Sequence, residues 1–170
     1  MIYPLRFVLR LMGFTLLVTL CLPAAVSVTI TSNPIGRVFT VDGAGCGAGG
    51  FAAPQALSWN PGANCTVTFV SPHSTQIGTQ YVFAAWQDGP TANPRVIVTP
   101  GQPATYTANF TTQFFLTAGA DPPAGGTVSG GGWYSLGSTA SLNATPSSGY
   151  HLVDWTLQRL RNRVPFLPAS

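Results

Sequence analysis

The sequence Tyr81–Gly89, YVFAAWQDG, and the later sequence Tyr150–Thr156, YHLVDWT, share one pattern: a Tyr, four further residues and then a Trp. In the first of them, a largely apolar run ends at Asp88-Gly89, a residue pair that is typical of turns. This pattern predicts a half-buried strand that leads into a turn. Because the pattern occurs twice, we expect an internal repeat built around this strand.

The sequence around the first copy predicts further short strands that are separated by turn-forming pairs such as Pro61-Gly62 and Pro100-Gly101. In CTVTF, which begins at Cys65, apolar residues alternate with Thr, as expected where one face of a sheet is buried. The predicted strands are VTITS, RVFTV, QALSW, CTVTFV, QYVFAAW, PRVIV and ATYTANF. Short strands between such turns predict an all-β fold with antiparallel pairing.

The composition agrees with a folded β protein and excludes two other classes. Apolar residues make up 45% of the 170 residues and charged residues only 6%, so the chain is not disordered through excess charge. Between residues 28 and 158, Arg37 and Arg95 stand against four Asp, which gives a net charge of −2, although the whole chain carries +3. Since this part has no basic stripe to follow a phosphate backbone, we expect no nucleic-acid partner.

The first 27 residues have the three parts of a secretory signal. Arg6 and Arg10 precede the apolar run LMGFTLLVTLCL, and Ala25 and Ser27 occupy the −3 and −1 positions of a small-residue cleavage site. Cleavage after Ser27 would release an exported chain with no further membrane-spanning segment. The alternative is an uncleaved anchor helix, although the apolar run is shorter than the roughly 20 residues that a bilayer span requires.

Two cysteines, Cys46 and Cys65, remain after removal of the signal. In an exported protein the economical interpretation is one disulfide between them. It would close a Gly-rich loop of about 20 residues and contribute roughly 3 kcal/mol to stability. The alternative is a pair of free buried thiols. A metal site is not expected, because it would need more ligands than two Cys supply.

A second, shorter copy of the first module follows it along the chain. QFFLTAGADPPAGGTVSGGG corresponds to the opening hairpin, WYSLGSTASLNATPSSG to SWNPGANCTVTFVSPHS, and YHLVDW to YVFAAW. In this alignment Tyr134 falls on Trp59, Ala140 on Cys65, Leu142 on Val67 and Ala144 on Phe69. The second copy has no counterpart of the closing sequence RVIVTPGQPATYTANF, and the residues after Trp155 contain three Arg and no Gly. We therefore divide the chain into a signal segment (1–27), module A (28–111), a truncated module B (112–156) and an aberrant tail (157–170).

Residues 113–156 resemble the bacterial repeat known as the divergent internalin-type B-repeat. The pattern of that family is Gly-Gly-x-Val, an aromatic residue, Gly-x-x-Val-x-Leu-x-Ala-x-Pro and then Gly-Tyr-x-Phe-x-x-Trp. The matching positions are Gly125, Gly126, Val128, Tyr134, Gly137, Ala140, Leu142, Ala144, Pro146, Gly149, Tyr150, Leu152 and Trp155. Ala140 and Leu152 differ from the family in size. The resemblance implies small β-rich modules of secreted or surface proteins that serve as spacers or adhesive units, without catalytic residues.

We find no constellation of residues that predicts catalysis, a cofactor or a metal. Gly45, Gly47 and Gly50 have dinucleotide-binding spacing, but the sequence after them, FAAPQALSW, has no helical period to bind a phosphate. His151 and Asp154 share one predicted strand, where a separation of three residues places them on opposite faces. We therefore expect no enzyme, no cofactor and no metal site.

Aromatic side chains are the remaining candidates for a binding role. We assign four of them to the structural core of the repeat: Tyr81, Trp86, Tyr150 and Trp155. In an unbulged strand, Tyr81 and Trp86 would point to opposite faces. Trp133 and its neighbour Tyr134 are the candidates for stacking on a sugar, with burial in the core as the alternative.

Together these features predict a non-catalytic, exported bacterial repeat protein or fragment, secreted or held at the cell surface. It would act as a structural or adhesive segment of a larger protein, with other repeat modules or cell-surface components as partners. The alternative is a carbohydrate-binding accessory module of an exported enzyme, with glycans as partners.

Overall fold

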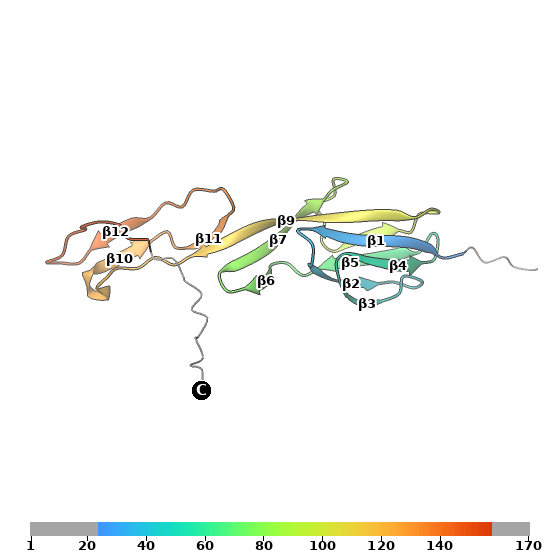
Figure 1. Ribbon diagram of the computed structural model, residues 1–170, viewed down its shortest axis with the longest axis horizontal. Helices are drawn as coiled ribbons and strands as arrows, with labels where there is room; N and C mark the ends of the chain where they lie inside the picture. Colours follow the sequence, from blue (N-terminus) through green and yellow to red (C-terminus); the bar gives the residue numbers. More distant parts are fainter. Residues whose placement is uncertain (1–23, 158–170) are drawn as a thin grey trace, which may run out of the picture.

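The computed structural model describes residues 24–157, which form an all-β molecule, as predicted. The molecule is elongated, and two groups of strands lie end to end along the long strand β9 (Figure 1). The strands are β1 (Val26–Asn33), β2 (Val38–Asp42), β3 (Gly49–Ala52), β4 (Gln55–Trp59), β5 (Asn64–Phe69), β6 (His73–Gln76), β7 (Thr79–Trp86), β8 (Arg95–Val98), β9 (Ala104–Leu116), β10 (Gly126–Ser129), β11 (Gly132–Ser135) and β12 (Asn143–Pro146), with a short 3-10 helix, η1 (Pro123–Gly125), before β10.

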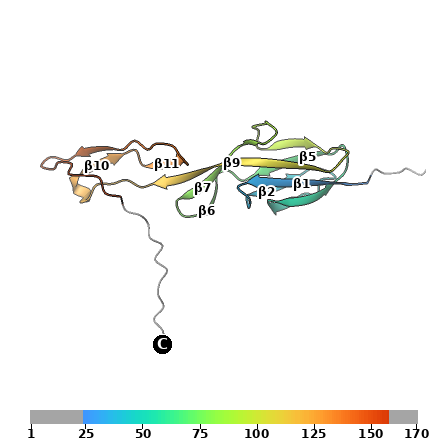
Figure 2. The same ribbon diagram turned by 45° about the horizontal axis from the view of Figure 1, so that its top comes forward.

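Module A is a sandwich of two sheets. One has the strand order β4-β1-β9-β7-β6, and the other has the order β3-β2-β5-β8. Figure 2 shows β1 and β9 side by side in the first of these sheets. The predicted opening hairpin is wrong, because β1 and β2 belong to different sheets and do not pair. The chain crosses between the layers at residues 34–37, which leaves the edge of β1 free for β9. The described strand pairs are antiparallel, as predicted, except that of β1 with β9, which is parallel.

The core of module A lies between the two sheets. Aromatic rings fill its centre: Phe69 lies 5.1 Å from Phe39 and 5.6 Å from Trp86, measured between ring centroids. The apolar faces of both sheets contribute, and the most deeply buried side chains are Val28, Ile30, Phe39, Val41, Cys46, Trp59, Cys65, Val67, Phe69, Trp86 and Ala108. Burial of such large rings dominates the stability of a small β core. The alternation predicted for β5 is present, since Cys65, Val67 and Phe69 are all buried.

A β-bulge in β7 explains how its aromatic residues reach the core. The pairing with β9 shifts between Phe83 and Ala85, so one residue of β7 has no partner. Because of this extra residue, Phe83 and Trp86 come to the same face, and their rings lie 6.0 Å apart. Tyr81, two residues before Phe83, lies on that face as well.

Module B repeats the strand arrangement with which module A begins. In module A, β1 pairs with β4 and β2 pairs with β5, all antiparallel. In module B, the last residues of β9 pair with β11, and β10 pairs with β12, again antiparallel. The predicted boundary between residues 111 and 112 falls within β9, so one strand serves both modules.

The strand predicted at Tyr150–Thr156 is not present. These residues have no regular structure, and their large side chains are exposed: Tyr150 is 48% and Trp155 51% accessible. The assignment of these two rings to a repeat core is therefore corrected. The physical reason is that β7 pairs along β9, whereas no described strand stands beside Tyr150–Thr156 to pair with it.

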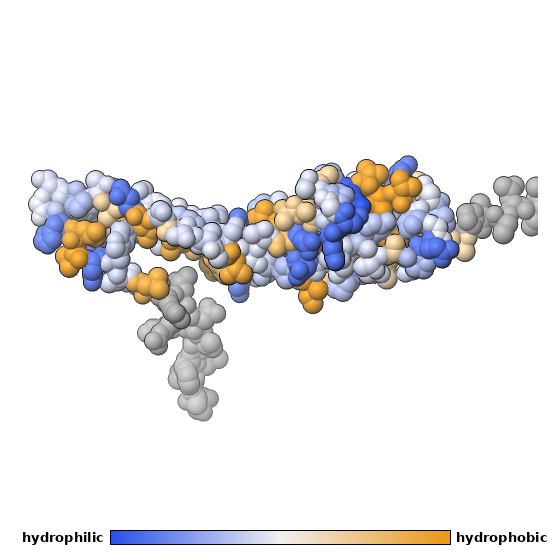
Figure 3. Space-filling view, turned by 90° about the horizontal axis from the view of Figure 1, so that it is seen from above, coloured by the Kyte–Doolittle hydropathy of each residue, from blue (hydrophilic) through white to orange (hydrophobic). Residues whose placement is uncertain are grey.

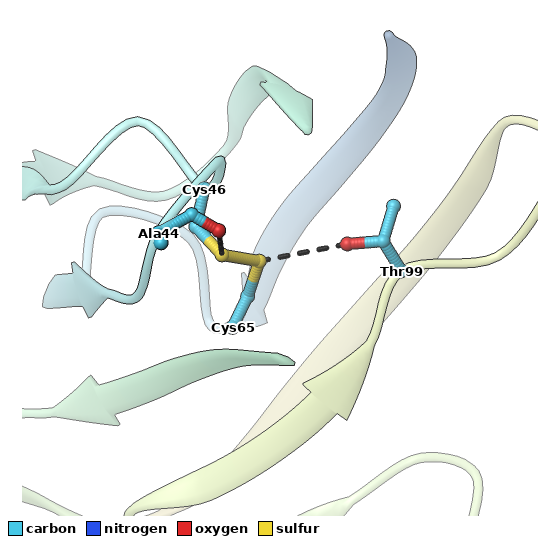
Figure 4. The surroundings of a disulfide bond; sticks show 4 residues. All are labelled: Ala44, Cys46, Cys65 and Thr99. Atoms are coloured by element: carbon cyan, nitrogen blue, oxygen red, sulfur yellow. Dashed lines mark hydrogen bonds between the residues drawn. A yellow bond between two sulfur atoms is a disulfide. The ribbon is translucent and has the colours of Figure 1, made fainter. Parts of the chain in front are cut away.

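The predicted disulfide is confirmed. Cys46 and Cys65 are bonded, with their Cα atoms 5.5 Å apart, and both residues are fully buried (Figure 4). Because a disulfide sulfur has no proton, the Thr99 hydroxyl donates the hydrogen bond to Cys65 Sγ, at 3.5 Å. Gly43 has a φ of +129°, and a Cβ there would lie only 2.9 Å from Cys46 Sγ. Glycine is thus required where the chain turns toward the bond.

Two predictions concern residues at the ends of the chain. β1 begins at Val26, which is buried and pairs with Trp59, so the cleavage predicted after Ser27 would remove two residues of this strand. Residues 1–23 of the predicted signal and residues 158–170 of the predicted tail lie outside the described residues.

Candidate functional site

The first candidate site is an exposed aromatic pair where the two modules meet. Trp133 of β11 lies opposite Phe115 of β9, and their ring centroids are 5.1 Å apart in an edge-to-face arrangement. Both side chains remain open to solvent, with Trp133 40% and Phe115 49% accessible. Aromatic rings with one free face can stack on the apolar face of a ligand. Sequence reasoning identified Trp133 but missed Phe115, although the run FF at 114–115 occurs in the repeated opening strand.

A row of polar side chains runs beside this pair. The Gln80 side-chain amide donates to Gln113 Oε1 at 2.8 Å, and the Gln113 amide donates to Ser135 Oγ at 3.4 Å. The three residues lie on β7, β9 and β11, in register across the sheet. Gln113 and Phe115 share one face, because they are two residues apart on β9. The row therefore ties both modules together and places amide and hydroxyl groups next to the aromatic pair.

Tyr134 does not belong to the same surface as Trp133. Neighbouring residues of a strand point to opposite faces, and Tyr134 pairs with Phe114 rather than Phe115. Its hydroxyl donates to the carbonyl of Gly130, which fixes the ring within its own module. The two residues predicted as one stacking site are therefore separated by the thickness of the sheet.

The second candidate site is an open cleft in module B with a volume of about 490 Å³. Its walls are the segment after β9, the pair β10–β12 and the irregular segment that carries Tyr150 and Trp155. Asp121 and Asp154 lie at the cleft, and no Lys or Arg is among the described residues that line it. Figure 3 shows apolar surface over both ends of the molecule, including the end formed by module B. The cleft is therefore lined by polar and apolar groups alike, with two carboxyl groups at its border.

The third candidate is a cationic corner of module A. Arg37 is only 6% accessible, and its guanidinium lies 3.7 Å from the ring centroid of Tyr81, a cation–π contact. Its Nη2 donates to the carbonyl of Ile35, whereas Nε and Nη1 are buried without a partner among the described residues. The pKa of His73 is lowered, mainly because its side chain is partly buried and to a lesser extent because the positive charge of Arg37 repels a proton there. The corner holds a buried positive charge that packs on an aromatic ring, so we assign it a role in packing.

Another arginine is paired. Arg95 makes two hydrogen bonds of 2.7 Å to the carboxylate of Asp88 and lies over the rings of Trp86 and Tyr106. The hydrogen bonds from Arg95 lower the pKa of Asp88 below its ordinary 3.8. These two hydrogen bonds hold the turn that follows β7, where the sequence predicted only that Asp88-Gly89 would form a turn.

Over residues 24–157, no three His, Cys, Asp or Glu side chains gather closely enough to hold a metal ion. His151 and Asp154 both line the cleft of module B, but the strand on which they were expected is not formed. Within the same residues, no helix has the length and apolar character needed to cross a bilayer.

Comparison with known proteins finds one family that part of the chain resembles. Residues 116–162 match the family model of the divergent InlB B-repeat domain. This part of the chain is similar to a bacterial B-repeat-type domain, in agreement with the resemblance seen in its sequence. Neither the curated proteins nor the solved structures contain a match.

Proposed function

We propose that this chain, with a B-repeat-type domain as its second module, is a non-catalytic exported bacterial protein that serves as a structural or adhesive segment. The observation that carries the proposal is the continuity of β9, whose 13 residues run through both modules. A shared strand allows no linker, so the modules act as one rod rather than as two independent domains. Repeat proteins of this kind present surfaces at a fixed spacing.

The family match and the disulfide support the same role. B-repeat domains are typically non-catalytic, and a buried disulfide is typical of proteins outside the reducing cytosol. Export can be tested by fractionating cells that express the full chain and by measuring the intact mass of the released protein. A mature form that begins at Val28 would support the cleavage predicted after Ser27, and retention of the full mass in the cell would contradict export.

The rod can be tested by small-angle X-ray scattering of the full chain. Insertion of Gly-Ser-Gly between Gln113 and Phe114 would interrupt β9 at the point where it passes from one module to the other. We expect this variant to give the broadened distance distribution of two flexibly joined bodies. The same insertion after Gly101, in the exposed loop before β9, is the matched control and should leave the distribution unchanged. Equal scattering from both variants would contradict the rod.

The exposed aromatic pair favours a second role, the binding of glycans. Phe115 and Trp133 offer free ring faces, and Gln113 and Ser135 supply hydrogen-bonding groups beside them. On a glycan array, Trp133→Ala should abolish any binding that the unaltered chain shows. The control is Tyr134→Phe, which changes the opposite face and should bind as before. Absence of binding by the unaltered chain would leave the structural role alone.

A further inference from the structure

Module B can be compared with module A position by position, because two strand pairings of module A recur in module B. Tyr134 aligns with Trp59 in the sequence, Tyr134 pairs with Phe114, and Trp59 pairs with Val26. Phe114 therefore corresponds to Val26, and Leu116, two residues later, corresponds to Val28. The pairings of β10–β12 and β2–β5 likewise place Val128 on Phe39, with Ala144 on Phe69. The end of β9 with β11, and β10 with β12, thus form the same frame as β1 with β4 and β2 with β5.

In module A this frame is closed by the first half of β9. Residues Ala104–Asn109 pair in parallel with β1 along the edge opposite β4. Tyr106, Ala108 and Phe110 point into the sandwich from this half of the strand: Ala108 is fully buried, and the two rings pack on the core. The alternation of aromatic and small residues lets this strand fill the space between the sheets.

In module B no described residue pairs at the equivalent place. Beyond Phe115, whose amide donates to the carbonyl of Gly78, the edge of β9 opposite β11 has no partner among the described residues. β9 ends at Leu116, and residues 117–122 have no regular structure. From Gly119 to Pro122 this segment lines the cleft of about 490 Å³. Trp155, which aligns with the 1% accessible Trp86, is 51% accessible beside it. Val128 and Ala144 occupy the places of two Phe, so the cleft has room for rings that another segment supplies.

We propose that the cleft of module B is a binding site for an extended peptide that completes the module as an added strand. The peptide lies parallel to the segment after Leu116, as β9 lies parallel to β1. Its alternate side chains enter the cleft in an aromatic–small–aromatic order, like Tyr106, Ala108 and Phe110. Because Asp121 and Asp154 border the cleft, the peptide is neutral or basic. Such addition of a strand to an open sheet edge derives affinity from main-chain hydrogen bonds and specificity from alternate side chains.

This site does not depend on the structural role proposed above, since a rod with or without an added strand keeps its shared β9. The test uses the full chain and a synthetic peptide with the sequence of residues 101–112, GQPATYTANFTT. Hydrogen exchange read by mass spectrometry should show slower exchange of backbone amides in residues 117–128 when the peptide is present. Calorimetric titration should give a saturable isotherm with one site.

Two variants of the peptide distinguish specific binding in the cleft from non-specific binding, and they leave the protein unaltered. Replacement at the position of Ala108, Ala→Arg, puts a long side chain toward the cleft and should weaken binding at least tenfold. Replacement at the position of Thr107, Thr→Arg, puts the same side chain toward solvent and should leave binding intact or strengthen it. Equal binding by both variants, or unchanged exchange in residues 117–128, would overturn the proposal.

Two further outcomes would replace the proposed partner with the chain itself. If the full chain fails to bind but a chain ending at Leu157 binds, the residues that follow occupy the cleft and the proposal fails. If residues 117–128 become protected with rising protein concentration in the absence of peptide, a second copy is the occupant and the proposal also fails. On the protein side, Val128→Asp should abolish peptide binding, whereas Leu136→Asp, at an exposed position that does not line the cleft, should not.

Discussion

Modules A and B begin with the same paired strands, yet within residues 24–157 these strands are buried in module A and partly exposed in module B. In module A, Phe39 and Phe69 meet across β2 and β5 and are covered by β9 and Trp86. In module B the equivalent pair is Val128 and Ala144, both half-buried beside an open cleft. The difference shows that the strand frame is set by local pattern and turns, whereas burial requires a second layer to close over it.

We expect the largest change in stability when the repeated Trp is replaced in each module, at Trp86 and at Trp155. Trp86→Ala should lower the free energy of unfolding by about 3–5 kcal/mol, because it removes a buried ring from a packed core. Trp155→Ala should change it by less than about 0.5 kcal/mol, because the ring is half exposed. Urea unfolding followed by circular dichroism measures both values.

Trp86→Phe is the control for the first variant, since it keeps an aromatic ring and should recover part of the loss. A destabilisation by Trp155→Ala comparable to that of Trp86→Ala would show that module B has a closed core, and the contrast between the modules would then fail.

The disulfide gives the next largest effect, and only module A has it. Cys46→Ala combined with Cys65→Ala should lower stability by roughly 3 kcal/mol, since the bond closes a loop with a sequence separation of 19 residues. Thermal unfolding with and without a reducing agent measures the loss in the unaltered chain. The double variant should be insensitive to the reducing agent, and hydrogen exchange in β10 and β12 should not change. Equal loss of protection in both modules would mean that they unfold as one cooperative unit.

Much of the fold of module A can be predicted from the sequence, because its strands are short, alternating and bounded by Pro and Gly. The burial of Cys65, Val67 and Phe69 follows directly from their period of two. The pairing does not follow, because a turn such as that after Asn33 can close a hairpin or carry the chain to another sheet. The bulge in β7 is similarly hidden, since YVFAAW carries no mark of the register shift between Phe83 and Ala85.

The candidate sites were less predictable than the fold. The sequence predicts Trp133 as a stacking candidate, but its partner Phe115 depends on the pairing of β11 with β9. The pairing also separates Tyr134 from Trp133, because adjacent residues of a strand face opposite ways. For Tyr150 and Trp155 the repeat pattern predicted a core strand that is not formed. A sequence pattern reports what a strand could bury, whereas burial itself depends on which other segments are present.

Replacement of Asn93 should cause a smaller loss of stability, again within module A. Its side chain accepts from the Phe69 amide and donates to the Phe69 carbonyl, both at 2.9 Å, at the end of β5. Asn93→Ala would leave both backbone groups without these partners and should cost about 1–3 kcal/mol. β12, which corresponds to β5, has no equivalent side chain among the described bonds. Hydrogen exchange should therefore become faster at Phe69 and not at Ala144. Unchanged exchange at Phe69 would contradict a stabilising role of the two hydrogen bonds of Asn93.

The smallest effect is the pH dependence of the Asp88–Arg95 pair, which also belongs to module A alone. The hydrogen bonds from Arg95 hold the folded-state pKa of Asp88 below 3.8, so the folded protein binds fewer protons than the unfolded chain in this range. The contribution of the pair to stability is therefore fully present above the ordinary pKa and decreases as the pH falls through the folded-state pKa. Because the Asp88 side chain is 49% accessible, the contribution should be below about 1 kcal/mol and should shrink further in high salt. Urea unfolding between pH 3 and pH 6 should show this step in the unaltered chain and not in Asp88→Asn. A step of equal size in both chains would contradict a contribution from the Asp88–Arg95 pair.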